Sequence, residues 1–299
     1  MTLKPASIAE LQELLPRSRN VDTVLLDDVA NLIEHVPGDM TATVQAGMSL
    51  VDFQSRLGKA GQWLPLDPPE PEAVTIGGLL ASNLSGPRRF ACGTVRDWLI
   101  GLAVVLPDGS LIRNGGRVVK NVAGFDLCRL FVGACDTLGI IVEATFKLLP
   151  VPEAEAHLAK TCESLGEAKA MLDTIWTSDL QPTVLDLHRI EGAPFTLVVG
   201  FAGPSADVVV QSRNAIELGF EGEATLDYDA RFRRTTSRFT SVSPRNLVSL
   251  LQTLGDEPFV ARAGNGVVYH ANAKPPKLPS PDLQKRVKNI FDPEEVLPG

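Results

Sequence analysis

The amino-acid sequence predicts an α+β protein made of two consecutive parts, residues 1–150 and 151–299. Short strand-like runs and short apolar helical segments follow one another through the first part. Pro150 and Pro152 then flank a short polar linker, a combination that marks a boundary. The second part predicts the order strand, helix, strand, strand, helix, strand, which is the βαββαβ arrangement of ferredoxin-like domains.

Local start and stop signals predict the elements of the first part. Residues 41–44 alternate as a strand does, Ser49 and Asp52 form a capping pair, and Gly61 closes the helix that follows. The other predicted elements are a Pro-rich extended stretch, a short apolar helix, a hairpin, a second helix and a long buried strand. They lie at residues 62–71, 75–86, 99–113, 126–134 and 139–149.

The second part shows comparable signals. Ser164 with Glu167 caps the first helix, and Pro204-Ser205 with Asp207 starts the second. Ser243 followed by Pro244 predicts a further helix, before two strands around residues 264–266. The six segments of the βαββαβ unit are residues 156–161, 164–177, 183–189, 195–201, 205–218 and 223–228.

Composition excludes several classes of function. The chain has 44 % hydrophobic and 21 % charged residues, as soluble globular proteins do, and a formal net charge of −8. Nucleic-acid binding needs clustered Lys and Arg, so an acidic chain argues against it. Neither a membrane span nor a signal peptide is indicated. We therefore expect a cytoplasmic protein.

The sequence predicts no metal site. Its four cysteines include no Cys-x-x-Cys pair, so neither a zinc site, an iron–sulfur cluster nor a disulfide framework is indicated. His157, His188 and His270 are isolated from one another, without a second ligand at metal spacing. We expect each of them to be a packed or surface histidine.

The most informative stretch is Thr75-Ile76-Gly77-Gly78, at the predicted start of a helix. Paired glycines there let backbone N–H groups approach a diphosphate without an intervening side chain. Standing alone, the same glycines could merely allow close helix packing. Further glycine, asparagine and arginine positions follow, however, at residues 83–97 and 139–143.

Four segments carry a resemblance to a known family. They are residues 64–69, 85–89, 95–97 and 118–127, and the last contains Lys-Asn-Val-Ala-Gly-Phe-Asp, a string without a general structural reason to recur. On these residues the chain closely resembles the PCMH-type FAD-binding domain of the vanillyl-alcohol-oxidase superfamily, and within it the E subunit of glycolate oxidase. The resemblance covers residues 36–152.

This resemblance implies that FAD lies between two α+β subdomains, with its diphosphate on backbone N–H groups and its flavin ring facing the second part, a cap domain. The residues implied to contact the diphosphate are Thr75, Ile76, Gly77 and Gly78. Pro65 is implied to lie near the ring, and Gly139 with Ile141 against the adenine and ribose. The residues implied to line the flavin are Asn83, Ser85, Gly86, Gly93 and Thr94.

Four polar residues of the same region have two interpretations each. Asp97 either contacts the flavin or accepts hydrogen bonds as a turn or helix cap. Arg88 and Arg89 either bind a carboxylate substrate bidentately or lie in a solvated loop. Lys120 either approaches the flavin or substrate or is a surface lysine.

The chain departs from the family pattern at its start. Flavin domains of this family begin with a strand and a Gly-Gly-Gly-Thr type of loop that holds the other side of the diphosphate, whereas here no glycine precedes Gly38. Residues 16–20 run directly into residues 21–27, so the N-terminal subdomain is predicted to be truncated. Losing one group of charge-assisted bonds costs FAD binding on the order of a few kcal/mol, unless another part compensates.

We expect FAD to be bound non-covalently. The histidine that links the flavin in relatives lies in the missing loop, and no cysteine stands between Pro65 and Gly78. The second part adds no catalytic constellation, so the catalytic residues stay unknown. Its basic segment, Arg231, Arg233, Arg234 and Arg238, is expected on a solvated strand face rather than against an anionic substrate or an acidic partner. Residues 291–293 resemble the closing motif of the family.

Two functional hypotheses follow. In the first, the chain binds FAD, accepts electrons from a 2-hydroxy acid of the glycolate or D-lactate class, directly or through a sister flavin subunit, and passes them to an iron–sulfur subunit. Such a complex could lie at the periphery of the inner membrane. In the second, the chain is a degenerate, flavin-free subunit that keeps the fold for assembly. UDP-sugar reductase chemistry on the same fold is disfavoured by the string at residues 120–126.

Overall fold

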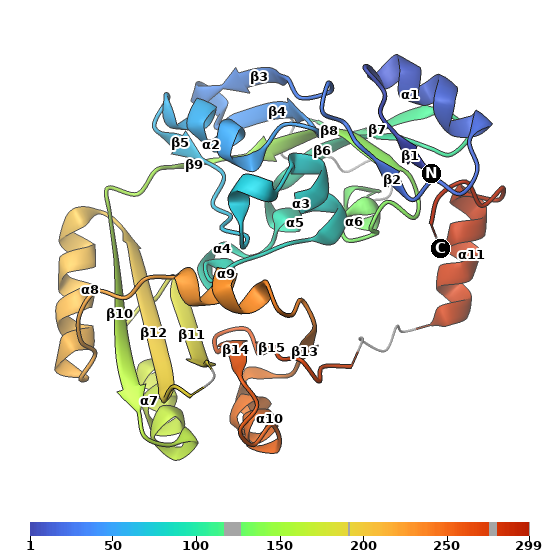
Figure 1. Ribbon diagram of the computed structural model, residues 1–299. Helices are drawn as coiled ribbons and strands as arrows, with labels where there is room; N and C mark the ends of the chain where they lie inside the picture. The colour runs from blue at the N-terminus through green and yellow to red at the C-terminus, as the bar shows by residue number, and fades with distance from the viewer. Residues whose placement is uncertain (117–126, 191, 275–279, 299) are drawn as a thin grey trace. The chain divides into compact units, whose positions relative to one another are not determined.

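The computed structural model describes residues 1–116, 127–190, 192–274 and 280–298. The chain forms two compact units, and each of them is discontinuous in sequence (Figure 1). Unit 1 contains Met1–Leu84, Thr94–Val151 and Leu278–Gly299. Unit 2 contains Pro152–Lys277 together with the short segment Ser85–Gly93. None of the described helices is both long and apolar enough to cross a membrane.

Unit 1 is built on a five-stranded antiparallel sheet with the strand order β3-β4-β8-β6-β7. The strands are β3 (Leu32–Val36), β4 (Thr41–Gln45), β6 (Leu99–Val105), β7 (Leu111–Gly115) and β8 (Ile140–Lys147). Two short pairs flank it, β1 (Thr2–Leu3) with β2 (Thr23–Val24) and β5 (Gln62–Trp63) with β9 (Leu149–Pro150). The helices of this unit are α1 (Ile8–Leu14), α2 (Leu50–Gly58), α3 (Ile76–Ser82), α5 (Val95–Trp98), α6 (Leu127–Phe131) and α11 (Pro281–Phe291).

Both faces of this sheet are covered. Because side chains alternate along a strand, Leu102 and Val104 of β6 pack in one cluster with residues of α2 and α3. Ala103 and Val105 point to the other face and pack in a second cluster with Leu11 of α1. Val296 and Leu297 from the C-terminal tail also belong to this second cluster. The sheet therefore holds helix α3 on one face while the chain termini cover the other.

Several predicted elements of unit 1 are confirmed. The Oγ of Ser49 caps α2 by accepting a hydrogen bond from the N–H of Asp52 at 3.1 Å. Strands β6 and β7 form the predicted hairpin. In its turn, Asp108 accepts a hydrogen bond from the N–H of Ser110 at 2.8 Å, and Gly109 adopts a positive φ of 82°. Glycine fits that conformation at little cost, whereas a Cβ would strain it.

Unit 2 is built on a six-stranded antiparallel sheet with the order β10-β12-β11-β14-β15-β13. Its strands are β10 (Ala154–Cys162), β11 (Val184–Arg189), β12 (Phe195–Gly203), β13 (Phe239–Ser241), β14 (Phe259–Arg262) and β15 (Val267–Tyr269). Its helices are α4 (Arg89–Cys92), α7 (Leu165–Thr177), α8 (Ser205–Glu217), α9 (Asp227–Arg233) and α10 (Leu247–Thr253). Apolar residues of α7, α8 and α10 form the core on one sheet face, and α9 packs against the other.

One predicted strand of unit 2 is wrong. Residues 223–228 were expected to complete the βαββαβ unit, but helix α9 begins at Asp227 instead. Glu221 alone occupies the expected place beside β10, through an isolated bridge to Ala159. The first three strands keep the expected ferredoxin-like neighbours, and strands β13 to β15 extend the sheet at its other edge. The α+β class is confirmed, with the last ferredoxin-like strand reduced to that bridge.

Candidate functional site

The N-terminus of helix α3 carries the glycine pair. Thr75 caps the helix, because its Oγ1 accepts a hydrogen bond from the N–H of Gly78 at 3.1 Å. The N–H of Ile76 donates to the carbonyl of Met48 at 2.9 Å, and the N–H of Gly77 donates to the carbonyl of Ala46 at 2.7 Å. Of the four residues expected to contact the diphosphate, three, Ile76, Gly77 and Gly78, thus have N–H groups that already have acceptors within the chain.

The two glycines have different surroundings. A Cβ on Gly77 would lie 3.2 Å from both the Cβ and the carbonyl oxygen of Ala46, so this glycine allows α3 to pack closely on the end of β4. Gly78 is exposed, and a Cβ there would meet only the Oγ1 of Thr75 at 3.3 Å. The packing role considered for the pair is present at Gly77, and Gly78 leaves the helix start open to a ligand.

The C-terminus of α3 holds an unsatisfied polar group. Asn83 adopts a left-handed conformation with φ of 50° and ends the helix. Its side-chain Oδ1 is buried and has no hydrogen-bond partner among the residues that the structure describes. A buried acceptor without a partner costs free energy, and a donor on a bound ligand would remove that cost.

Thr94 and Asp97 form a capping box at the start of α5. The carboxylate of Asp97 accepts hydrogen bonds from the backbone N–H of Thr94 at 2.7 Å and from its hydroxyl at 3.1 Å. Of the two interpretations of Asp97, the helix cap is therefore present in the structure. Gly93, one residue earlier, has a φ of 73° and ends helix α4.

Ser85, Gly86, Arg88 and Arg89 belong to the segment of unit 2 that precedes α5. Arg88 forms an ion pair with Glu155 of β10 at 2.5 Å. Arg89 donates from Nη1 to the Oγ of Ser85 at 3.2 Å. Both side chains are half-buried and hydrogen-bonded rather than solvated, so the solvated-loop interpretation does not describe them.

Three other expected flavin contacts lie in the interior of unit 1. Pro65 is buried, and Ile141 is 3 % exposed in β8, where it packs in the cluster that contains α3. A Cβ on Gly139 would lie 2.7 Å from Cγ1 of Val104, so this glycine allows the start of β8 to approach β6. Their packing roles are visible, and their contact with the adenine end or the ring stays a prediction.

Lys120 and the diagnostic string at residues 118–126 lie outside the described residues. The described titratable groups form no cluster of three or more possible metal ligands. Burial lowers the pKa of His157 and lowers that of His188 to about 4. Both imidazoles are therefore neutral at pH 7.

Unit 1 contains a cavity of about 880 Å³ beside helix α11. Its lining includes Asn20, Val21 and Asp22, which lie where the family pattern is interrupted. Gly133 and Leu138 also line it. None of the residues expected to bind the flavin lines this cavity.

The residues present fit FAD at one end of α3 better than at the other. At the C-terminus of α3, the buried Oδ1 of Asn83 has no hydrogen-bond donor among the described residues. At the N-terminus, Gly78 is exposed to solvent. The N–H groups of Ile76, Gly77 and Gly78 are engaged, however, so a diphosphate there must displace or share existing bonds. The expectation of a solvated strand face is wrong for Arg233, which lies in helix α9 of unit 2 and donates to the carbonyl of Ser85 at 2.7 Å.

Comparisons with known proteins agree with this fold. Residues 4–115 match the model of a family described as FAD binding domain. The chain is 38 % identical over 163 residues to the glycolate oxidase subunit GlcD of Bacillus subtilis, covering 54 % of this chain and 35 % of that protein. It is 41 % identical over 138 residues to the glycolate oxidase subunit GlcE of Escherichia coli, covering 46 % and 39 %. The chain thus spans well under half the length of these relatives.

Solved structures extend the likeness to the whole chain. An alkyldihydroxyacetonephosphate synthase superposes with a TM-score of 0.75 and 18 % identity, covering 99 % of this chain and 76 % of that one. At this identity the likeness shows a shared fold alone. Together, these findings show that residues 4–115 match an FAD binding domain and that about half of the chain is similar in sequence to glycolate oxidase subunits.

Proposed function

We propose that this chain is an FAD-linked oxidoreductase subunit, similar to the glycolate oxidase E subunit, that acts on a 2-hydroxy acid of the glycolate or D-lactate class. The observation that carries the proposal is the 41 % identity to GlcE over 138 residues. A D-lactate dehydrogenase of Anaerostipes hadrus, 35 % identical over 148 residues, supports the same substrate class.

Bound FAD would supply the hydride chemistry, while the protein binds and orients the reactants. In the proposed site, the buried Oδ1 of Asn83 would accept a hydrogen bond from the cofactor. Residues 75–78, 93 and 94 would help to hold the cofactor, as the resemblance implies. Asp97 contributes by fixing the backbone of Thr94 through the capping box.

Arg89 is the better candidate of the two arginines for binding the substrate carboxylate. Arg88 is paired with Glu155, which already neutralises its charge. A guanidinium has five N–H donors, so Arg89 keeps donors for a carboxylate beyond the one it gives to Ser85. Lys120 stays in the proposal on its sequence alone.

We also propose that the chain works in a heteromeric complex, with a sister flavin subunit and an iron–sulfur subunit as electron acceptor. The names of two relatives, glycolate oxidase subunits GlcD and GlcE, support an assembly of this kind.

A flavin-free role in assembly is the second candidate function. It is favoured by the hydrogen bonds of Ile76, Gly77 and Gly78, which occupy the N–H groups that a diphosphate needs. The absence of glycine before Gly38 points the same way, because the opposite side of the diphosphate then has no glycine loop in this sequence.

A visible spectrum and an FAD titration of the purified chain distinguish the two candidates. We expect the bands of oxidised flavin, released intact by acid precipitation, and their bleaching by glycolate or D-lactate without oxygen. Asn83→Ala should weaken FAD binding about tenfold, because a hydrogen bond worth roughly 1–1.5 kcal/mol is lost. Asn289→Ala, an exposed position on α11, is the matched control. A colourless chain that takes up no FAD, alone or with its sister subunits, would leave only the assembly role.

A further inference from the structure

The 85–93 segment, Ser85–Gly93, is held by unit 2 at several points. Phe90 meets Trp176 of α7 edge to face, with ring centroids 5.9 Å apart. It also covers Gly264, where a Cβ would lie 2.1 Å from Cδ2 of Phe90. Arg88 is paired with Glu155 of β10. A side chain at 264 or a shift of α7 would therefore displace the segment.

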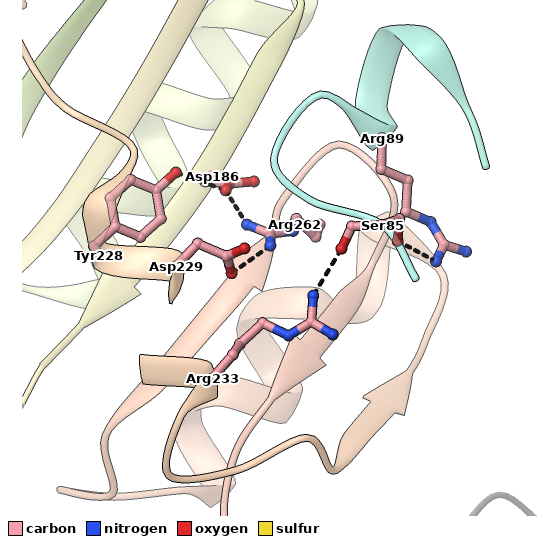
Figure 2. Close-up of polar contacts among 7 residues, drawn as sticks. All are labelled: Ser85, Arg89, Asp186, Tyr228, Asp229, Arg233 and Arg262. Carbon is pink, nitrogen blue, oxygen red and sulfur yellow. Dashed lines mark hydrogen bonds and ion pairs between the residues drawn. The ribbon is translucent and has the colours of Figure 1, made fainter. Parts of the chain in front are cut away.

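Arg233 binds the first residue of the segment, Ser85. Its Nη1 donates to the main-chain oxygen of Ser85 at 2.7 Å (Figure 2). Its guanidinium lies over the ring of Tyr269 with 4.3 Å between the Cζ atom and the ring centroid. A planar cation stacked on an aromatic ring loses rotational freedom, so its hydrogen bond has a fixed direction. Ser85 is 3 % exposed, which removes water as a competing donor.

Helix α9, which carries Arg233, is fixed by a buried ion bridge. Asp186 of β11 and Arg262 of β14 are direct neighbours across the two strands, on the sheet face that α9 covers. Arg262 is 0 % exposed and binds Asp186 through Nη1 and Asp229 of α9 through Nη2 (Figure 2). Next to Asp229, the hydroxyl of Tyr228 donates to Oδ2 of Asp186 at 2.7 Å.

This bridge is better suited to orientation than to stability. Removing three charged groups from water costs free energy that offsets much of their mutual attraction. A well-packed apolar cluster would stabilise the position of the helix to a similar extent. One oxygen each of Asp186 and Asp229 and the Nε of Arg262 have no partner within the described residues, which raises that cost. The bonds are directional, however, so they restrict the placement of α9 on the sheet.

We propose that Arg233 is a positioning residue: the Asp186–Arg262–Asp229 bridge fixes helix α9 so that Arg233 holds the main-chain oxygen of Ser85, and thereby orders the 85–93 segment for cofactor binding. The link to the cofactor rests on the proposed function. The hold on the segment rests on the contacts within unit 2 alone.

Hydrogen exchange of the full chain without cofactor tests the hold itself. In the segment the N–H groups of Arg89, Cys92 and Gly93 are hydrogen-bonded, and their exchange rates report its order. Arg233→Met keeps the aliphatic length and removes the donors, and we expect exchange at these amides to become about tenfold faster. Arg231→Met, at an exposed position of the same helix, should leave them unchanged. Equal rates in both variants would overturn the proposal.

FAD affinity of the same variants tests the consequence. We expect the dissociation constant to rise about tenfold in Arg233→Met, to recover partly in Arg233→Lys, and to stay unchanged in Arg231→Met. Faster exchange with unaltered FAD affinity would contradict the positioning role. If no variant and not even the unsubstituted chain binds FAD, the proposed function fails, whereas the exchange result still decides the hold on the segment.

Gly264→Ala gives a second, independent way to loosen the segment if Arg233→Met does not fold. The added methyl group must displace Phe90, so the same three amides should exchange faster while Arg233 is intact. Thermal unfolding of each variant verifies that the rest of the chain is folded. Unchanged exchange in Gly264→Ala would show that unit 2 does not order the segment, contrary to the proposal.

Discussion

At the scale of single residues, the structure separates side chains that serve the fold from those left for a ligand. Gly77 and Gly139 allow close packing, and Asp97 caps a helix. Asn83 differs from them, because its buried Oδ1 has no partner among the described residues. The sequence could indicate all four positions, since each belongs to a recognisable motif. It could suggest the cap formed by Asp97, whose partner Thr94 is three residues away, but not the packing partners of Gly77 and Gly139, which are far away in the chain.

Asp136 offers a test of electrostatics at a single residue. Burial raises the pKa of its carboxyl to about 6, so ionisation in the folded state is unfavourable. For a carboxyl whose pKa is raised by folding, stability is lost as the pH rises from about 4 through 6. Asp136→Asn should therefore stabilise the chain at pH 8 by up to about 3 kcal/mol, and the gain should vanish below pH 4.

Urea unfolding of this variant at several pH values is the measurement. Asparagine tolerates the left-handed conformation of residue 136, where φ is 59°, so the backbone is not disturbed. Asp39→Asn, at an exposed position, is the control. A gain of the same size at every pH would show that the charge of Asp136 is not its cause.

At the scale of elements, helix starts could be predicted from the sequence and helix α9 could not. Ser49 and Ser164 cap α2 and α7 as expected, because capping depends on residues three apart. Residues 223–226 of the expected strand form a connection that leads into α9. In α9, Tyr228 is hydrogen-bonded to Asp186, and Asp229 forms an ion pair with Arg262. These partners are 42 and 33 residues away, so no local pattern contains them. The inward position of Arg233 follows from the same contacts.

The bridge that fixes α9 predicts a non-additive set of variants. Arg262→Met leaves two carboxylates buried without their cation, and we expect a loss of about 3–5 kcal/mol in the free energy of unfolding. Replacing Asp186 and Asp229 by leucine in the same chain should restore most of it, because no unpaired charge is then buried. Chemical denaturation of the single and the triple variant measures the difference. Equal losses in both would contradict the assignment of the cost to unpaired charge.

Helix α11 is followed by a further buried carboxylate, Asp292, which has a different role. Asp292 is 0 % exposed and accepts hydrogen bonds from the N–H groups of Val296 and Leu297, both at 2.8 Å, and from Lys288 at 2.6 Å. Burial opposes its ionisation, but these donors outweigh that effect and lower the pKa of Asp292. The stabilisation is therefore present at neutral pH and is lost as the pH falls through this lowered pKa.

Asp292→Ala tests this role. We expect a loss of about 2–4 kcal/mol at pH 7, because two buried N–H groups and an ammonium lose their acceptor, and a smaller loss in acid. Glu294→Ala removes an exposed ion pair with Arg19 at 3.6 Å and should change stability by at most about 1 kcal/mol. Thermal unfolding of both variants at pH 7 and pH 3 is the measurement, and a pH-independent loss would contradict the carboxylate's role.

At the scale of the whole molecule, the sequence predicts the α+β class and the cofactor family but not the way the chain is divided. Motifs predict a family because they are local strings, such as residues 85–89. Which unit such a string packs against depends on distant residues, here Arg233, Trp176 and Gly264. The 85–93 segment therefore belongs to unit 2, although residues on both sides of it belong to unit 1.

A fragment made of residues 152–277 tests this division. Without the 85–93 segment it lacks Phe90, so Trp176 and the surface around Gly264 lose a packing partner. A synthetic peptide of residues 85–93 should bind the fragment and change the fluorescence of Trp176. The same peptide with Phe90→Ala is the control, and identical responses to the two peptides would show that Phe90 does not dock.

The interleaved order of the two units bears on how this protein could be rearranged. If the chain were cut at residue 152 and unit 2 were fused to another flavin domain, the fused unit would lack the nine residues of the 85–93 segment. The new host would have to provide an equivalent stretch, with an aromatic side chain at the right spacing from its own helix. We therefore expect an exchange of unit 2 between relatives to succeed only when residues 85–93 and residues 152–277 are transferred together.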